Sequence, residues 1–338
     1  MRRRLLWSAL VTLGLLGLLE GGARLLPESV NGRLELVQDL DGSHSMVASE
    51  QVPGWDIRPP SGTMGTRSFA VNSWRMRGPE HPAQKGEGVE RIILVGDSAL
   101  LGWLLDWEET MGAVLERRRE ERFPGVDVQV GSCAAPGHST VQSIAKLEHH
   151  CLAFQPDVVI IGNLNSDGTQ WTMSDRERFR VPAWAAASRV LRELALYRSA
   201  RNLLLRQSVR RQRAQAIPQA GSLSSSSTAR TRVPPEEYRE NLGRLIQMSR
   251  EAGALPVLLV PPMQARIEGH PPPGGWPPYW DIMREVAAEE EVLLADGDSL
   301  FQATGHRERL LQTPVHPNAA GARKLGELLD QTLSADAP

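Results

Sequence analysis

The stretch that decides the fold is Ile92–Ser98, which reads IILVGDS. Four apolar residues in a row, closed by a glycine, predict a short strand that is buried on both faces. The serine then lies at the carboxyl end of this strand, where open parallel sheets bind their ligands. Because Gly, Asp and Ser all favour turns, the turn alone says little about function.

The same alternation continues along the chain. Strands apolar on both faces that alternate with helices indicate a parallel sheet covered on both sides. We therefore expect an α/β fold, a three-layer α/β/α sandwich with five parallel strands. The other predicted strands are Val126–Val130, Asp157–Ile161, Pro256–Val260 and Val292–Ala295, and the predicted helices are Glu108–Arg122, Ser139–Leu152, Pro235–Ala252 and Asn318–Leu333.

The N-terminal segment has a different composition. Arg2, Arg3 and Arg4 precede an uncharged run from Leu5 to Leu19. That order is typical of a signal peptide or of an uncleaved signal anchor, and the anchor is the favoured interpretation. The run covers only about 22 Å, less than the roughly 30 Å of a hydrocarbon core. Either way, we expect the rest of the chain outside the cytoplasm.

The sequence divides into three predicted regions. Residues 1–26 form the signal segment, 27–90 an irregular lead-in, and 91–335 the main domain. Within the main domain, residues 187–232 combine a basic helix, about 187–213, with a serine-rich stretch that has the composition of a disordered loop.

Composition and charge give no support for a nucleic-acid partner or a metal site. The 338 residues carry a formal net charge of −2, so charge gives no reason to expect a nucleic-acid partner. The two cysteines, Cys133 and Cys151, form no cluster at zinc spacing, and neither a metal nor a cofactor is expected. They stand at opposite ends of a predicted helix, about 20 Å apart, so we expect two free, buried thiols.

A histidine near the C-terminus could act as the base that a nucleophilic serine needs. The segment from Val315 to Gly321 reads VHPNAAG and places His316 just before the last predicted helix. From there the imidazole can reach the edge of the sheet where Ser98 lies. A serine and a histidine in this arrangement predict nucleophilic catalysis through an acyl-enzyme.

These residues resemble the SGNH/GDSL hydrolase family over about residues 91–333. The resemblance rests on Gly96-Asp97-Ser98, on Gly137 after the second strand, and on His316 followed by a proline. The lead-in at residues 71–80 is also similar to that of membrane-anchored bacterial members. The resemblance implies hydrolysis or transfer of acyl esters, often acetyl groups on envelope sugars or lipids, without metal or cofactor.

The same resemblance implies an oxyanion hole. Its donors would be the N–H groups of Ser98 and Gly137 and one side chain after the third strand. The family's Asn-Asp pair is replaced by Asn165-Ser166-Asp167, so an ungapped alignment makes Ser166 the donor and a one-residue shift makes it Asn165. We favour Asn165, because a carboxamide reaches farther than a hydroxyl.

The position of the triad's acid departs from the family pattern. The family carries its acid three residues before the histidine, where this chain has Thr313. A threonine can orient the imidazole but cannot balance the charge of an imidazolium. The sequence therefore predicts a Ser–His pair with Thr313 as an orienting residue. The alternative is a degenerate envelope binding protein that has kept the cleft and lost catalysis.

Overall fold

The computed structural model describes residues 2–26, 46–49, 51–57, 61–64, 67–171, 173–180, 191, 194–200, 203, 230–272, 276, 278–305 and 308–335. The chain divides into two compact units, residues 1–36 with 180–224, and residues 37–179 with 225–338. The predicted serine-rich loop and most of the predicted basic helix lie outside the described residues.

The smaller unit contains the helix α1, Arg2–Arg24, at the predicted signal segment. The carboxylate of Glu20 accepts hydrogen bonds of 2.9 Å from the N–H groups of Ala195 and Leu196, at the start of the helical residues 195–200. Across the described ranges no helix, α1 included, combines the length and the apolar character that crossing a bilayer requires.

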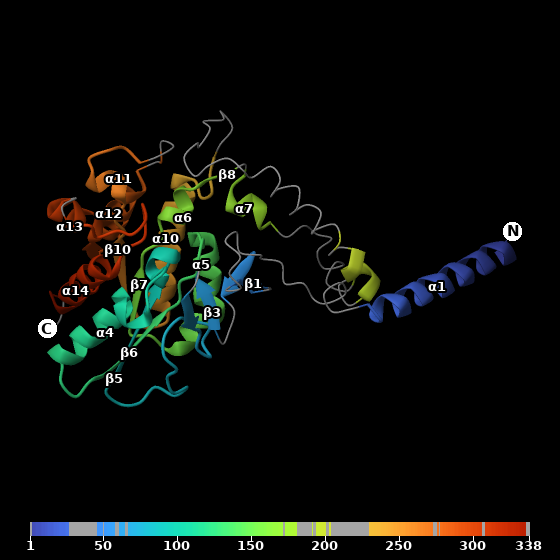
Figure 1. The fold of residues 1–338 in the computed structure, drawn as a ribbon, viewed down its shortest axis with the longest axis horizontal. Coiled ribbons are helices and arrows are strands. Elements are labelled where there is room, and N and C mark those ends of the chain that lie inside the picture. The colour runs from blue at the N-terminus through green and yellow to red at the C-terminus, as the bar shows by residue number, and fades with distance from the viewer. Residues whose placement is uncertain are drawn as a thin grey trace. The chain divides into compact units, whose positions relative to one another are not determined.

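The larger unit is built on the predicted five-stranded parallel sheet, whose order is β11-β10-β7-β5-β6 (Figure 1). In chain order this is the doubly wound arrangement 2-1-3-4-5, in which ligands bind where the connections change direction, between the first and third strands. Here those are β5 and β7. The strands are β5 Val89–Val95, β6 Asp127–Ser132, β7 Val158–Ile161, β10 Leu255–Val260 and β11 Leu293–Asp296.

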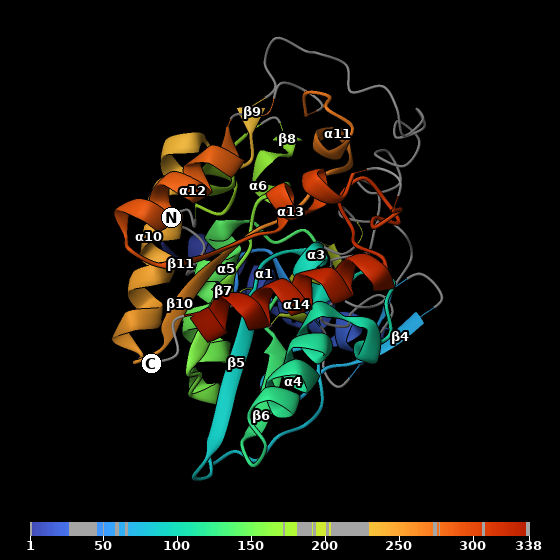
Figure 2. The same ribbon diagram turned by 90° about the vertical axis from the view of Figure 1, so that its left-hand side faces the viewer.

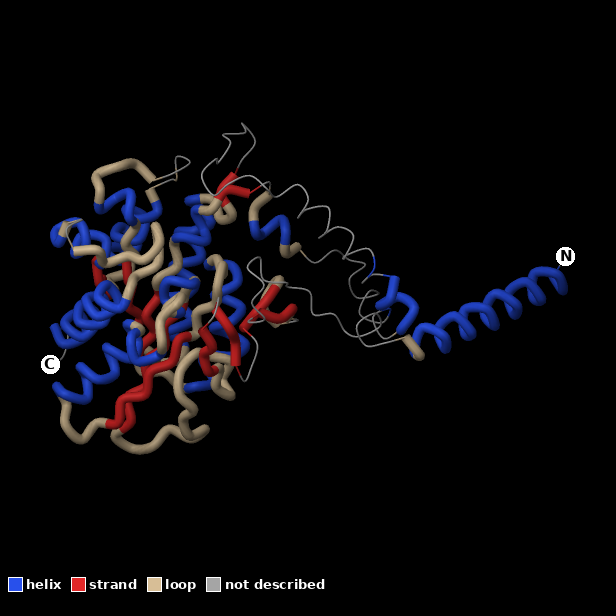
Figure 3. Tube along the Cα trace, in the orientation of Figure 1, coloured by secondary structure: helices blue, strands red, loops and turns tan. Residues whose placement is uncertain are grey.

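Helices cover both faces of this sheet, and the colouring of Figure 3 separates them from the strands. On one face α4 and α14 pack against each other, as Figure 2 also shows. On the other face α5, α10 and α12 pack together. The long helices are α4 Met111–Arg122, α5 Thr140–Lys146 with the π-helical turn Leu147–Cys151, α10 Pro235–Glu251, α12 Tyr279–Glu289, α13 Gly297–Thr304 and α14 Ala319–Ala335.

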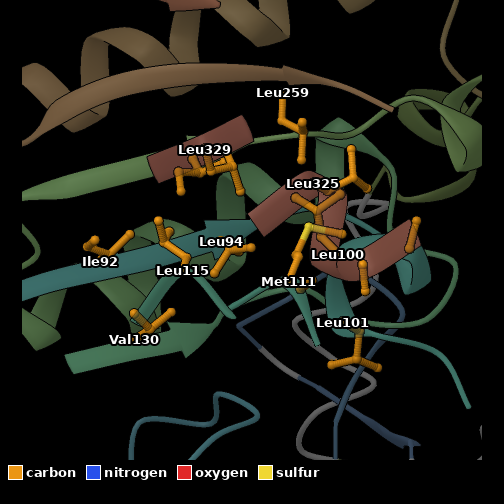
Figure 4. Close-up of a cluster of buried hydrophobic side chains, with 14 of the residues drawn as sticks. Ile92, Leu94, Leu100, Leu101, Met111, Leu115, Val130, Leu259, Leu325 and Leu329 are labelled. Atoms are coloured by element: carbon orange, nitrogen blue, oxygen red, sulfur yellow. The ribbon is translucent and has the colours of Figure 1, made fainter. Parts of the chain in front are cut away.

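Alternate residues of each strand supply the two halves of the core, because successive side chains of a strand point to opposite faces. On β5, Ile92 and Leu94 join the cluster under α4 and α14, which Figure 4 shows. Ile93 and Val95 join the cluster under α10 and α12. These four side chains are fully buried. The apolar run that predicted a strand buried on both faces is therefore confirmed.

The remaining elements are short. Two antiparallel hairpins, β1–β2 and β3–β4, come from the lead-in, and β8 pairs with β9. The short elements are β1 Met46–Ala48, β2 Trp55–Ile57, β3 Ser61–Met64, β4 Arg67–Ala70, α3 Ser98–Leu101, the 3₁₀ turns Trp107–Glu109 and Leu152–Phe154, α6 Asn165–Gly168, β8 Gln170–Trp171, α7 Asp175–Arg178, β9 Arg230–Thr231 and α11 Gln264–Ile267.

The prediction of two free thiols is wrong, because Cys133 and Cys151 form a disulfide with Cα atoms 6.1 Å apart. The error lies in treating Cys133 as one end of the helix, because the helix was predicted from Ser139 and begins at Thr140. After Cys133 the chain runs on through residues 134–139 before α5 starts at Thr140. The helix therefore starts beyond the sheet edge and returns toward Cys133, as the hydrogen bond from Lys146 Nζ to the carbonyl of Ala134 also shows.

Candidate active site

Ser98 begins the helix α3, directly after the turn that follows β5. Asp97 caps this helix, since its carboxylate accepts the N–H of Ala99 at 2.9 Å. The N–H of Ser98 belongs to the first turn, where no helical carbonyl is in reach. Among the described residues it has no acceptor. The turn therefore presents both the hydroxyl and a free N–H of the same residue at the sheet edge.

His316 lies within hydrogen-bonding distance of this serine, although 218 residues separate them. Its Nε2 is 2.8 Å from Ser98 Oγ, and its Nδ1 is 2.7 Å from Thr313 Oγ1. Thr313 Oγ1 also accepts the backbone N–H of His316 at 3.1 Å. The indole of Trp103 stacks on the imidazole with 5.9 Å between the ring centroids. The ring is thus held at both nitrogens and on one face.

The charge around His316 differs from that of a triad. Within the described ranges no carboxylate is hydrogen-bonded to this imidazole. Burial lowers the pKa of His316 from 6.5 to about 4. The ring is therefore neutral at neutral pH, and in the tautomer protonated at Nδ1 its Nε2 can accept the proton of Ser98. Among the described residues, an imidazolium formed in the reaction would have a hydroxyl, and not a carboxylate, at its Nδ1.

Gly137 lies on the loop after β6, the neighbour of β5 on one side. Its φ of +69° belongs to the left-handed region that glycine adopts most easily. Within the described part of the chain the N–H of Gly137 has no acceptor. The loop is tied to the serine turn by a 3.2 Å hydrogen bond from the N–H of Ala135 to the carbonyl of Gly96.

Asn165 and Ser166 are the first two residues of α6, which follows β7, the neighbour of β5 on the other side. Asn165 is 7% exposed, and neither polar atom of its side chain has a partner. Ser166, in contrast, donates its N–H to Asp97 at 3.2 Å, and its side chain also hydrogen-bonds Asp97. A buried amide without a partner costs about 1–3 kcal/mol, and a role in binding a reacting group is one explanation for such a cost. Of the two residues, only Asn165 has a side-chain N–H donor without a partner among the described residues.

The predicted site residues therefore fall into two groups. The structure brings Ser98, His316 and Thr313 into one chain of hydrogen bonds. It places Gly137 on the loop after β6 and Asn165 at the start of α6 after β7, beyond the carboxyl ends of the two strands that flank β5. Three free hydrogen-bond donors thus come from three neighbouring strand ends.

Two residues near the site have no counterpart in the sequence prediction. Trp55 in the lead-in donates its indole N–H to the carbonyl of Pro136 at 2.9 Å. Arg232 donates to the carbonyl of Gly137 at 2.7 Å and forms an ion pair with the buried carboxylate of Asp175. Each forms contacts across more than 50 residues, and no local pattern in the sequence predicts such contacts.

No family model matches the chain, and no curated protein matches it. Solved structures similar to the fold include TesA, with 21% identity over 73% of this chain and 99% of that one (TM-score 0.44). They also include the acetyl xylan esterase AlAXEase, with 16% identity over 73% and 100% (TM-score 0.47), and the lipase/acylhydrolase from Enterococcus faecalis, with 18% over 73% and 96% (TM-score 0.46). Similarities of this size transfer no activity.

Proposed function

We propose that the chain is a serine esterase or acyltransferase of the SGNH/GDSL type that acts through Ser98 and His316. The observation that carries the proposal is the 2.8 Å contact between Ser98 Oγ and His316 Nε2, formed by residues from opposite ends of the domain. A nucleophile and a base within hydrogen-bonding distance, with the base oriented by a third group, are what covalent catalysis needs. Here the third group is Thr313.

The reaction would proceed in two acyl-transfer steps. Ser98 Oγ attacks the ester carbonyl while His316 Nε2 takes the hydroxyl proton, and the carbonyl π electrons move to the oxygen. The intermediate collapses to an acyl-serine as the alcohol leaves with the proton from His316. Water or an acceptor alcohol then attacks the acyl group, with His316 again as base, and Ser98 is regenerated.

The negative oxygen of each intermediate would be bound by the N–H groups of Ser98 and Gly137 and by the amide of Asn165. The unpartnered state of these three donors supports the proposal. Loss of one such donor lowers turnover by about 100- to 1,000-fold in a protease example. Donors fixed before the substrate arrives need no reorganisation during the reaction, and this makes the hole effective.

The proposed substrate is a short acyl or acetyl ester of an envelope carbohydrate or lipid, and the proposed location is outside the cytoplasm. The arginine-led N-terminus supports export. The disulfide between Cys133 and Cys151 adds support, since disulfides persist mainly in oxidising compartments.

A second candidate function is binding without catalysis, in a cleft derived from an esterase. The observation that favours it is the hydroxyl of Thr313 at the position where a triad carries its acid. Replacing the acid of a protease triad by an amide lowers turnover by about ten-thousand-fold. A site that lacks the acid would still bind a ligand and would turn it over very slowly.

A fluorophosphonate probe separates the two candidates. The probe should label the wild-type protein and should not label Ser98→Ala, and the same variant should lose turnover of p-nitrophenyl acetate. Its thermal midpoint should stay close to that of the wild type, because the hydroxyl of Ser98 contacts only the imidazole among the described side chains. Equal labelling of both proteins would refute the assignment of the nucleophile. No labelling of either would favour the binding protein.

A further inference from the structure

The lead-in strand β2 contacts the loop that carries Gly137. Trp55, the first residue of β2, donates its indole Nε1–H to the carbonyl of Pro136 at 2.9 Å. In return, His138 Nε2 lies 2.9 Å from the carbonyl of Trp55, and because a carbonyl only accepts, this nitrogen carries the proton. The two hydrogen bonds join the same residue of the lead-in to both sides of Gly137.

The first of these bonds fixes the direction of the Gly137 N–H. In a planar trans peptide, the carbonyl of one residue and the N–H of the next point in opposite directions. The carbonyl of Pro136 points to the indole of Trp55, so the N–H of Gly137 points away from it. A left-handed glycine has wide conformational freedom, and this peptide could otherwise rotate easily. The peptide that follows is held separately, by Arg232 on the carbonyl of Gly137.

Trp55 is itself held firmly. The guanidinium groups of Arg178 and Arg232 lie 5.7 and 5.9 Å from its ring centroid, and the ring of Phe179 packs edge-on at 6.4 Å. The next residue, Asp56, is fully buried and forms an ion pair of 2.8 Å with Lys146 of α5, which is also fully buried. The indole therefore acts from a fixed position.

We propose that Trp55 is a positioning residue of the oxyanion hole: its indole N–H holds the Pro136–Gly137 peptide so that the Gly137 N–H stays directed at the reacting oxygen. The inference rests on the proposed function, and it makes the lead-in hairpin part of the active site. Trp55 touches no reacting atom, and its effect passes through the peptide that it holds.

Kinetics of Trp55→Phe test this role, since phenylalanine retains an aromatic ring and lacks the N–H. We expect kcat on p-nitrophenyl acetate to fall about 10- to 100-fold, less than the about 100- to 1,000-fold for losing a donor outright. KM should change less than about twofold, because the hole acts on the transition state. Trp171→Phe is the matched control: its ring also lies under Arg178, at 5.3 Å, and is 45% exposed.

A second variant covers the case in which phenylalanine disturbs folding. Incorporation of 3-benzothienylalanine at position 55 replaces the indole N–H by sulfur and keeps the bicyclic shape. The amide of Gly137 gives a readout besides activity. Carbonyl-¹³C proline with ¹⁵N-glycine selects only the Pro-Gly peptides of the chain, at Gly54, Gly125, Gly137 and Gly274. In both variants the Gly137 resonance should move, and it should not move in Trp171→Phe.

Folded variants with wild-type kcat, or with an unmoved Gly137 resonance, would overturn the inference. A lower kcat with an unmoved resonance would also overturn it, since the loss would then not pass through this peptide. Failure of the proposed function has a different signature, namely no Ser98-dependent turnover in the wild type itself. In that case the Gly137 resonance alone still decides whether Trp55 holds the peptide.

Discussion

Replacing Thr313 by aspartate should raise turnover, and the structure allows the size of the gain to be worked out. The hydroxyl of Thr313 is 2.7 Å from His316 Nδ1, and it can either accept a hydrogen bond from a protonated Nδ1 or donate one to an unprotonated Nδ1. Only the first arrangement leaves Nε2 free to accept the proton of Ser98. A carboxylate can only accept, so aspartate would select the productive tautomer and would also stabilise the imidazolium.

The magnitude follows from the charge and from the reach of the side chain. Two unit charges about 4 Å apart interact by about 4 kcal/mol at an effective dielectric constant of about 20, or about three pKa units. Two effects reduce this gain. The new carboxylate must be partly desolvated, and its oxygens reach one bond farther than a threonine hydroxyl that is already at 2.7 Å. We therefore expect kcat to rise about 10- to 100-fold, below the about ten-thousand-fold effect of a native acid.

The pH dependence of kcat/KM is the diagnostic assay. Burial lowers the pKa of His316 to about 4, so the wild-type acid limb should lie near that value. Thr313→Asp should move the limb upward by about two units, since a neighbouring negative charge favours the protonated ring. Thr313→Asn is the control, because it has the reach of aspartate without the charge. If both variants had the same rate and the same acid limb, charge at this position would be irrelevant and the reasoning would fail.

Three further predictions follow from the same geometry. Asn165→Ala should lower kcat about 100-fold or more and Ser166→Ala much less, because only the amide is unpartnered; the reverse ranking in steady-state kinetics would restore the ungapped alignment. Reducing Cys133–Cys151, which are 18 residues apart, should lower the free energy of unfolding in urea by about 3 kcal/mol; an unchanged midpoint would contradict this. The free energy of unfolding of the wild type should fall by up to about 3 kcal/mol more than that of His316→Gln between pH 6.5 and pH 4. The reason is that the unfolded histidine takes up a proton in this window and the folded one does not. Equal falls in urea titrations at the two pH values would contradict this.

The sheet could be predicted from sequence because a parallel strand covered on both faces must be apolar throughout. Ile92–Val95 meets that requirement, and all four side chains are fully buried. The Ser–His contact followed from topology, since both residues were expected at the same sheet edge. The choice between Asn165 and Ser166 did not follow, because it depends on the contact of Ser166 with Asp97, formed by backbone and side-chain atoms 69 residues apart.

The disulfide and the role of the lead-in were not predictable for different physical reasons. Pairing Cys133 with Cys151 depends on how far residues 134–139 carry the chain before α5 begins, and loop geometry leaves no periodic signal. β2 has three residues, too few for an alternation to be recognised. Its position is fixed by side-chain bonds such as those of Trp55 and Asp56, which join it to residues more than 80 positions away.

The proposed oxyanion donors and the base His316 differ in the groups that hold them, and this difference indicates which step limits the rate. The proposed oxyanion donors come from three segments that are each held by hydrogen bonds: the serine turn by Asp97, the Gly137 loop by Trp55 and Arg232, and the start of α6 by the bond of Ser166 to Asp97. The base has no charged partner among the described residues, and the group hydrogen-bonded to its Nδ1 is a hydroxyl. An oxyanion hole and substrate binding alone retain about 10³- to 10⁴-fold catalysis over water when triad members are removed. Proton transfer to His316, and not binding of the developing oxyanion, should therefore limit turnover, and a change that strengthens the base should raise the rate more than one that adds a further donor.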